Sequence, residues 1–270
     1  SPALPSGLGC EAAGIVEAIG EGVEGFFRGD AVSVVPALSM VRWPAYGEVA
    51  TFPAELVVRH PPSLSWEEAA ATWMRYATAY GALILVAKLG KRDCVGITAA
   101  SSSVGLAAIQ IANMVGAIPI AVTRTSGKKQ ALREAGAAYV VASAEEDLEA
   151  RLNEIAGPEG VRVVFDAVGG PSFRPLTAAM SRGGTLIEYG GLSPEPTPFP
   201  LFAVLSKSLT LRGYLVHEIV ADPARLEAAK TFILRGLESG ALKPIIARIF
   251  PFEQIVEAHR GRSWAENGPD

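Results

Sequence analysis

The spacing of hydrophobic and polar positions changes near residue 66. Before it, short apolar runs are separated by glycine and proline, a pattern that predicts strands joined by turns. The strands expected in this part are residues 13–19, 31–35, 48–52 and 56–58. After it, residues 67–86 have the apolar spacing of a helix, and a different architecture begins.

From residue 95 onward, short β-branched runs alternate with helix-like segments. The expected strands are residues 95–99, 118–123, 139–141, 161–165, 185–189 and 209–214. The expected helices are residues 106–115, 128–135, 148–156, 173–180 and 223–239, and a strand at 242–249 and a short helix at 252–259 follow. Strand–helix alternation of this kind predicts an α/β fold, with a parallel sheet covered by helices on both faces.

Composition limits the class of protein. With 270 residues, 49% of them hydrophobic, the chain can bury a large core in one or two domains. A net charge of −4 gives no basic footprint for nucleic acid or a membrane surface. We find no apolar run of about 20 residues and no leader pattern in residues 1–9. Two cysteines make no disulfide framework, so we expect a cytoplasmic protein.

Two segments compete as a nucleotide-binding loop. Gly20, Gly22 and Gly25 match the dinucleotide fingerprint G-x-G-x-x-G, but they connect two expected strands. A phosphate loop must leave a buried strand and begin a helix, whose N-terminal N–H groups hold the pyrophosphate. The first segment is therefore interpreted as a turn.

The second segment has the required context but departs from the fingerprint. Residues 94–112 (CVGITAASSSVGLAAIQIA) read as a buried strand, a turn of small residues and a helix. Ala99 and Ser102 stand in the first two glycine positions, and Gly105 keeps the third, which allows a helix to pack closely on a strand. An ordinary capped helix in an α/β core remains the alternative on this segment alone.

The end of the next strand favours a particular cofactor. An NAD site usually has Asp or Glu there to bind the ribose 2′-hydroxyl, but residues 122–129 read VTRTSGKK. Arg124, Lys128 and Lys129 stand about 20 residues after the loop and would bind a 2′-phosphate. We therefore expect NADP(H), with a solvated basic turn as the alternative.

Six motifs in order resemble a known family. They are GCEAAGIV at 9–16, GDAV at 29–32, TAY at 78–80, TAASSSVG at 98–105, FDAVGG at 165–170 and PFEQI at 251–255. Together they resemble the medium-chain dehydrogenase/reductases, specifically the zinc-independent quinone oxidoreductase and enoyl reductase branch. Relative to that family, the chain looks shortened at both ends, with residues 261–270 polar and unlike a strand.

The resemblance implies two domains and a reaction. A Rossmann NADP(H)-binding domain, a doubly wound parallel sheet, would span 67–240, and an incomplete GroES-like β-rich catalytic domain would combine 1–66 with 241–270. Hydride would pass from NADPH to a small-molecule quinone or enoyl substrate in the cleft between them. The cofactor-binding residues expected are Thr78, Ser102, Ser103, Val104, Thr123, Arg124, Thr125, Lys128, Val168, Gly169, Tyr189 and Gly190.

Tyr46 and Tyr76 are the candidate catalytic residues, because a tyrosine could donate a proton to the developing enolate. A packing role for each is the alternative. None of the six tyrosines has lysine four residues later, which excludes a short-chain dehydrogenase.

No metal is expected, since Cys10 replaces the zinc-binding His of the family and the three histidines are scattered. Residues 209–214 resemble the edge strand that pairs in family dimers, so we expect a homodimer. Two other functions stay open: a cofactor-binding protein without turnover, and an enoyl reductase domain of a larger synthase.

Overall fold

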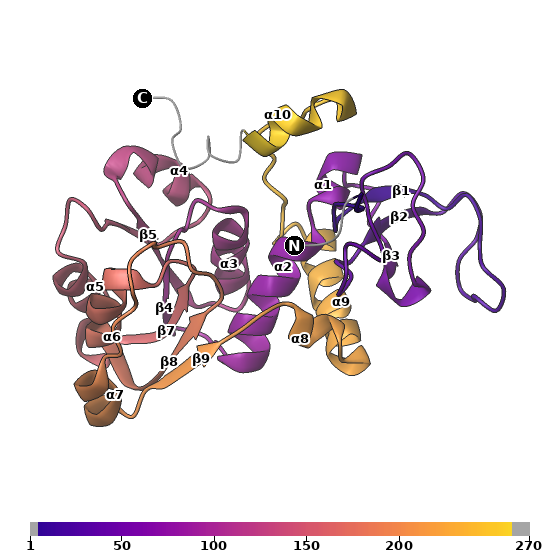
Figure 1. The fold of residues 1–270 in the computed structure, drawn as a ribbon. Helices are drawn as coiled ribbons and strands as arrows, with labels where there is room; N and C mark the ends of the chain where they lie inside the picture. The colour runs from indigo at the N-terminus through magenta and orange to yellow at the C-terminus, as the bar shows by residue number, and fades with distance from the viewer. Residues whose placement is uncertain (1–4, 261–270) are drawn as a thin grey trace.

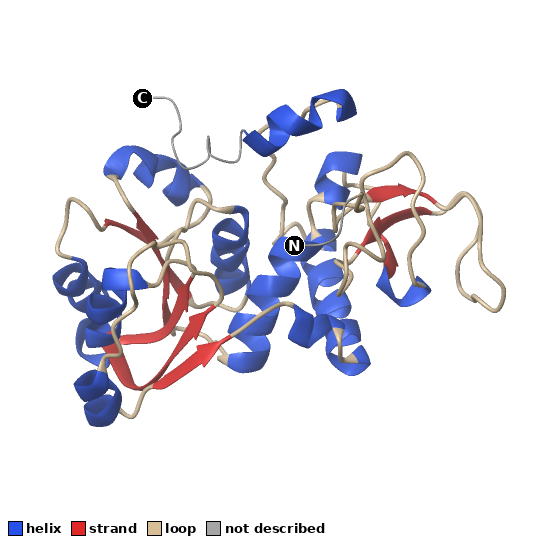
Figure 2. Ribbon diagram, in the orientation of Figure 1, coloured by secondary structure: helices blue, strands red, loops and turns tan. Residues whose placement is uncertain are grey.

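The computed structural model describes residues 5–260, which form two sheets joined by helices (Figures 1 and 2). The strands are β1 (Ala13–Ile15), β2 (Ala31–Val34), β3 (Val57–Arg59), β4 (Cys94–Ile97), β5 (Ile118–Thr123), β6 (Tyr139–Ala142), β7 (Val161–Asp166), β8 (Met180–Glu188) and β9 (Thr210–Gly213). The helices are α1 (Trp66–Ala70), α2 (Trp73–Tyr80), α3 (Ser103–Met114), α4 (Lys129–Glu134), α5 (Leu148–Ala156), α6 (Phe173–Ala179), α7 (Leu201–Lys207), α8 (His217–Val220), α9 (Pro223–Glu238) and α10 (Ile255–Arg260).

The larger sheet confirms the predicted α/β architecture. Its six strands are all parallel and follow the order β6-β5-β4-β7-β8-β9. The strand order therefore reverses direction between β4 and β7, as in doubly wound sheets that bind ligands at the carboxyl ends of these strands. The loops that the sequence singled out follow β4, β5, β7 and β8.

Helices cover both faces of this sheet, and each face has its own core. Ile97, Ile109 and Phe165 belong to the cluster beneath α2 and α3. Val164 and Leu176 belong to a second cluster, to which α5 and α6 contribute. All five side chains are fully buried, which fixes the strand ends to which the loops are attached.

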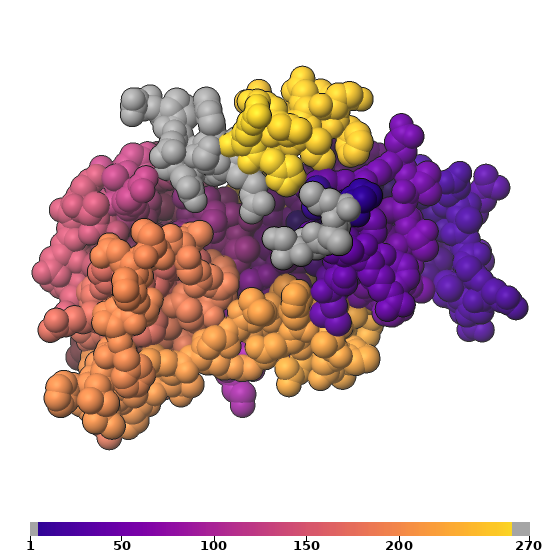
Figure 3. Space-filling model, viewed as in Figure 1, coloured from indigo at the N-terminus to yellow at the C-terminus, as the bar shows by residue number. Residues whose placement is uncertain are grey.

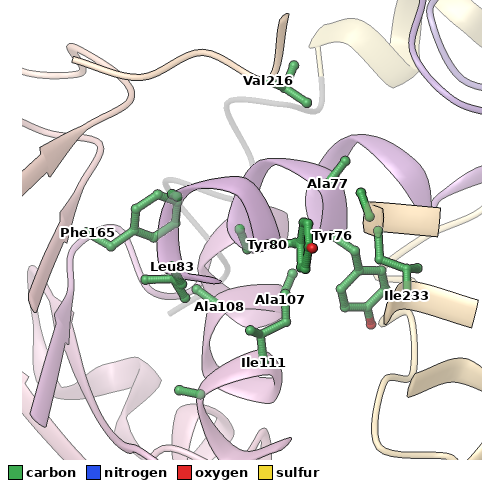
Figure 4. Close-up of a cluster of buried hydrophobic side chains, with 14 of the residues drawn as sticks. Tyr76, Ala77, Tyr80, Leu83, Ala107, Ala108, Ile111, Phe165, Val216 and Ile233 are labelled. Carbon is green, nitrogen blue, oxygen red and sulfur yellow. The ribbon is translucent and has the colours of Figure 1, made fainter. Parts of the chain in front are cut away.

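The small sheet, β1-β2-β3, is antiparallel and packs against α1 and α2. Trp73, at the start of α2, is buried and donates its indole N–H to the Ser33 hydroxyl at 2.8 Å. Val35 and Val58 of this part belong to the same buried cluster as α2 and α3. Figure 4 shows α2 side chains facing Ala107 and Ile111 of α3 and lying near Ile233 of α9. The core is therefore continuous between the two sheets.

Several predicted elements differ from the structure. Residues 48–52 and 242–249 were predicted as strands, but neither forms one. The helix predicted over 67–86 is interrupted after α1, and its last part is a π-helix, Gly81–Val86. Two helices, α7 and α8, were not predicted.

The sequence-based division into domains at residues 67 and 240 remains a prediction. Within 5–260, the segment 241–260 carries α10, which Figure 1 labels and which forms the yellow group of atoms at the top of Figure 3. The expectation about 261–270 lies outside the described residues. No helix in the described part of the chain is long and apolar enough to span a membrane.

Candidate functional site

The turn between β4 and α3 brings backbone close to the carboxyl edge of the sheet. Counted back from Gly105, the first glycine position of the fingerprint is Ala100 rather than Ala99, and Ala99, directly before it, has a φ of +43°. Ser102 caps α3, because its hydroxyl accepts the Gly105 N–H at 3.1 Å. A Cβ on Gly105 would lie 2.6 Å from the Ala100 carbonyl oxygen, so only glycine fits. The turn thus keeps the shape of a phosphate loop with two glycines replaced, and its small residues fit a pyrophosphate.

The competing glycine segment is a turn, as its context predicted. It connects β1 and β2, and the Val23 N–H donates to the Gly20 carbonyl within it. Gly22 and Gly25 both have positive φ, which explains the glycines by backbone conformation.

Cationic side chains gather at the end of β5. Lys128 extends its ammonium to 3.5 Å from the Ser101 hydroxyl, which links this strand end to the β4–α3 turn. Arg124 is exposed at the strand end, beside Thr123 and Thr125. These groups fit the 2′-phosphate of NADP(H).

Lys129 differs from this arrangement, because it forms an ion pair with Glu146 at 2.7 Å. The structure also adds a carboxylate that sequence reasoning missed. Glu145 accepts the Ser126 N–H at 2.9 Å and so lies against the cationic strand end. Glu145 lies 19 residues after Ser126 in the sequence, so local pattern did not indicate this contact.

The end of β7 is organised by one buried carboxylate. Asp166 is fully buried and accepts the Thr98 hydroxyl at 2.5 Å and the Val168 N–H at 2.9 Å. It also accepts the Gly169 N–H at 3.2 Å, and the Thr98 oxygen accepts the Ala167 N–H. This network shapes the loop that carries Val168 and Gly169, two expected cofactor residues.

Glu188 and Tyr189, at the end of β8, have unusual environments. Tyr189 stacks on Phe165 with 3.9 Å between ring centroids, and burial raises the pKa of its phenol. The Ser102 side chain lowers the pKa of the same phenol, but by less than burial raises it. Burial and the Asp166 carboxylate raise the pKa of Glu188 to about 8. Glu188 was not among the predicted site residues.

Thr78 lies in α2 with little exposed surface, and its hydroxyl donates to the Met74 carbonyl at 2.6 Å. The start of the same helix is held by Glu11, whose carboxylate accepts the Met74 N–H at 2.8 Å. Two residues earlier, Gly9 lies against the ring of Tyr46. The segment 9–11 therefore lies between Tyr46 and the helix that carries Thr78.

The two candidate catalytic tyrosines have different surroundings. Tyr46 is 42% exposed, and its hydroxyl lies 3.3 Å from Nε2 of His259. Both residues line a pocket of about 390 Å³ whose other walls include Leu8 and Val256. Tyr76 is buried and donates its hydroxyl proton to Gln110 at 2.7 Å. That environment matches the packing alternative, so the catalytic role predicted for Tyr76 has no support in this geometry.

Cys10 stands where zinc-binding members of the family have His, which makes its surroundings relevant to a metal site. Cys10 is half-buried, and no group of three or more His, Cys, Asp or Glu residues within 5–260 could hold a metal ion. A catalytic zinc needs about three protein ligands. No chemical step is therefore derived from a metal.

Comparison with known proteins identifies relatives along almost the whole chain. Residues 103–233 match the family described as zinc-binding dehydrogenase. Quinone oxidoreductase 1 of Escherichia coli (strain K12) is 33% identical over 261 residues, which cover 96% of this chain and 79% of the relative.

Solved structures agree with the fold described above. The crystal structure of Escherichia coli quinone oxidoreductase complexed with NADPH matches 100% of this chain and 82% of its own, with 31% identity and a TM-score of 0.88. A mycobacterial protein complexed with NADPH matches 98% of this chain and 81% of its own, with 26% identity and a TM-score of 0.87.

Proposed function

The chain belongs to the medium-chain dehydrogenase/reductases, in the quinone oxidoreductase branch, and from this premise we propose that it binds NADPH and reduces a small quinone or α,β-unsaturated carbonyl compound. The expected fold class is confirmed as well, with a Rossmann-type sheet and a GroES-like β-rich part matching the solved quinone oxidoreductases.

The cationic end of β5 is the observation that carries the choice of cofactor. Arg124 and Lys128 would hold the 2′-phosphate, and the turn from Ser102 to Gly105 would hold the pyrophosphate at the N-terminus of α3. Thr78 and the loops after β7 and β8 would line the nicotinamide end. When bound, NADPH supplies the hydride, while the protein supplies placement and electrostatics.

The substrate side is proposed from Tyr46 and its surroundings. The pocket of Tyr46 and His259 is mainly apolar, which suits a flat, hydrophobic acceptor. Tyr46 would donate a hydrogen bond to the acceptor oxygen. We propose that this reaction proceeds without zinc, since a catalytic zinc needs about three protein ligands and no group of three or more His, Cys, Asp or Glu residues within 5–260 could hold a metal ion.

Assembly and location form the remaining part of the proposal. Strand β9 is at the edge of the six-stranded sheet, and apolar side chains of the preceding segment, including Phe199 and Phe202, are exposed. An exposed apolar edge of this kind favours pairing with a second copy. We propose a cytoplasmic homodimer.

The test is a pair of titrations with NADPH and NADH, followed by nicotinamide fluorescence, on the unmodified protein and on Arg124→Ala. A charge-assisted contact to phosphate contributes about 1.5–3 kcal/mol, so the variant should bind NADPH about ten- to a hundredfold more weakly. Its NADH affinity should stay unchanged, because NADH has no 2′-phosphate.

Arg133→Ala is the matched control. Arg133 is exposed on α4 and lies outside the proposed site, so its removal should change neither affinity. Equal loss of NADPH affinity in both variants would mean that the effect comes from the net charge of the protein and not from a specific contact of Arg124. If the unmodified protein bound neither nucleotide, the assignment would have to be abandoned. If NADPH binds, its oxidation by quinone and enone acceptors then identifies the substrate class.

A further inference from the structure

Glu188 lies at the carboxyl end of β8, in the wall of a pocket of about 350 Å³. The same wall includes Val168, Gly169 and Gly190, three of the expected cofactor residues. Both carboxyl oxygens of Glu188 are buried, and neither forms a well-oriented hydrogen bond with an N–H or O–H of the described residues. A buried carboxylate without such donors is costly, so the group needs another means of stabilisation.

The neighbouring carboxyl group of Asp166 can stabilise the buried Glu188 carboxyl group. Strands β7 and β8 are paired in parallel with Asp166 opposite Glu188, and the Asp166 carboxyl group raises the pKa of Glu188. A hydrogen bond between the two carboxyl groups requires one shared proton, because two carboxylates repel each other. Asp166 already accepts hydrogen bonds from Thr98, Val168 and Gly169, whereas neither oxygen of Glu188 has such a donor among the described residues. The shared proton therefore belongs on Glu188.

The other charged or titratable groups near Glu188 do not neutralise its carboxylate, so they do not remove the need for this proton. Arg212, on β9, lines the same pocket, but its guanidinium pairs with Glu218 at 2.5 Å. Tyr189, the next residue in the chain, has a raised pKa and is a neutral phenol around neutral pH. Ser193 and Thr197, which complete the polar wall, carry no charge. The Gly190 N–H offsets only part of the effect of burial.

We propose that Glu188 is a positioning residue: as a carboxylic acid it donates its proton to Asp166, ties together the ends of β4, β7 and β8, and thereby holds the loops that bind the cofactor. The connection to β4 runs through the hydroxyl of Thr98, directly before Ala99 and the phosphate-binding turn. This inference rests on the proposed function, because it assigns the loops to a cofactor.

The consequence is a weaker cofactor site at alkaline pH. The pKa of Glu188 is about 8, so the proton is lost between neutral and moderately alkaline pH. Its loss places two buried carboxylates side by side at the strand ends and adds negative charge near an anionic cofactor. Both effects oppose binding. Because the pKa is raised in the folded state, the associated stability is present below the ordinary value of 4.5 and is lost as the pH rises through about 8.

The experiment compares the unmodified protein with Glu188→Gln and Glu188→Ala in NADPH titrations at pH 7, 8 and 9. A glutamine can donate an N–H to Asp166 at every pH, whereas an alanine cannot. The dissociation constant of the unmodified protein should rise at least about fivefold from pH 7 to pH 9, the lower end of usual coupling between two binding events. Glu188→Gln should bind with the same affinity at all three pH values. Glu188→Ala should bind weakly throughout.

The control is Glu195→Gln, which removes an exposed carboxylate from the loop that follows β8. It should keep the pH dependence of the unmodified protein. Thermal unfolding without cofactor gives a second readout: from pH 5 to pH 9 the unmodified protein should lose stability relative to Glu188→Gln.

Two results would overturn the inference while the proposed function stands. One is NADPH binding by the unmodified protein that does not change between pH 7 and pH 9. The other is a pH dependence that Glu188→Gln retains in full. Failure of the proposed function has a different signature, since no variant would then bind NADPH, although the unfolding data would still report the shared proton.

Discussion

Ala99 has a backbone conformation that alanine rarely adopts. Its φ of +43° falls in the left-handed region, where an L side chain costs roughly 1–2 kcal/mol. Ala99 lies directly before Ala100, which occupies the first glycine position of the fingerprint, so the sequence indicated the turn but not this backbone conformation. The structure shows that the turn is kept and that the strain lies in one residue.

Replacing Ala99 with glycine should therefore stabilise the protein. Glycine adopts positive φ without strain, and this gain exceeds its extra conformational entropy in the unfolded chain. We expect the free energy of unfolding, measured by urea denaturation, to increase by about 1 kcal/mol.

The adjacent residue offers the control. Ala100 is buried and has no positive φ, so Ala100→Gly should instead lower the free energy of unfolding by about 1 kcal/mol. The same direction of change for both variants would contradict the assignment of strain to Ala99.

Residue types revealed part of the candidate site but not its electrostatics. Gly105 could be assigned from spacing, because only its fixed distance from a buried strand matters. The partnership of Asp166 and Glu188 could not, since it depends on strand pairing between residues 22 positions apart. For Tyr76, position suggested a catalytic role, which stays a prediction, and sequence could not show that its phenol donates to Gln110 in the interior.

At the scale of elements, the buried parallel strands were the easiest to predict. Their continuous β-branched runs are typical of strands covered on both faces, and β5 was predicted with its exact bounds, residues 118–123. Residues 48–52 and 242–249 had similar composition, but no strand pairs with them among residues 5–260. A strand needs a neighbour, which local pattern does not reveal.

Helix α2 depends on a distant residue for its start. Its N-cap, Thr72, makes no side-chain cap, and the Met74 N–H is instead bound by Glu11 from the small-sheet part. Glu11→Ala should leave that N–H unpaired and lower the free energy of unfolding by about 1 kcal/mol. Hydrogen exchange in the first turn of α2 should become faster, which amide-resolved mass spectrometry can detect.

The variant Glu11→Gln distinguishes the hydrogen bond to the Met74 N–H from the effect of the Glu11 charge. Its amide oxygen can still accept the Met74 N–H, and burial, which raises the pKa of Glu11, no longer opposes a charge. This variant should keep the slow exchange of the unmodified protein. If Glu11→Ala exchanged equally slowly, α2 would not need this contact.

At the scale of the whole molecule, the edge of the larger sheet is the least protected region. Strand β9 pairs with β8 on one side and with no other strand in the described part of the chain. In the segment leading to it, Phe202 is 83% exposed and Leu205 is 67% exposed. Large exposed apolar groups beside an open edge are typical of an association surface.

Sedimentation velocity should therefore detect a dimer that Phe202→Asp converts to a monomer, because a buried charge at the interface would lack a partner. Phe27→Asp is the matched control, since Phe27 is 72% exposed but lies in the turn before β2. A monomer for the unmodified protein, or equal dissociation of both variants, would contradict the proposed surface.

The doubly wound parallel sheet was predicted from sequence, but the order of its strands and the continuity of the core were not. Periodicity describes segments one at a time, whereas α2 takes part in both regions. Trp73 donates to Ser33 beside the small sheet, and Ala77 belongs to the buried cluster that includes Phe165 of the larger sheet. Such a shared helix has no signature along the chain.

The shared helix also limits how this architecture can be recombined. A chimera that exchanged only residues 1–66 with another reductase would separate Ser33 from Trp73 and Glu11 from Met74. A breakpoint after residue 86 would keep those pairs but would break the packing of α2 on α3. No single crossover point preserves every contact, so small sheet, α2 and α3 are inherited as one block. Substitutions around Tyr46 and α10, outside the shared core, should disturb fewer of these contacts.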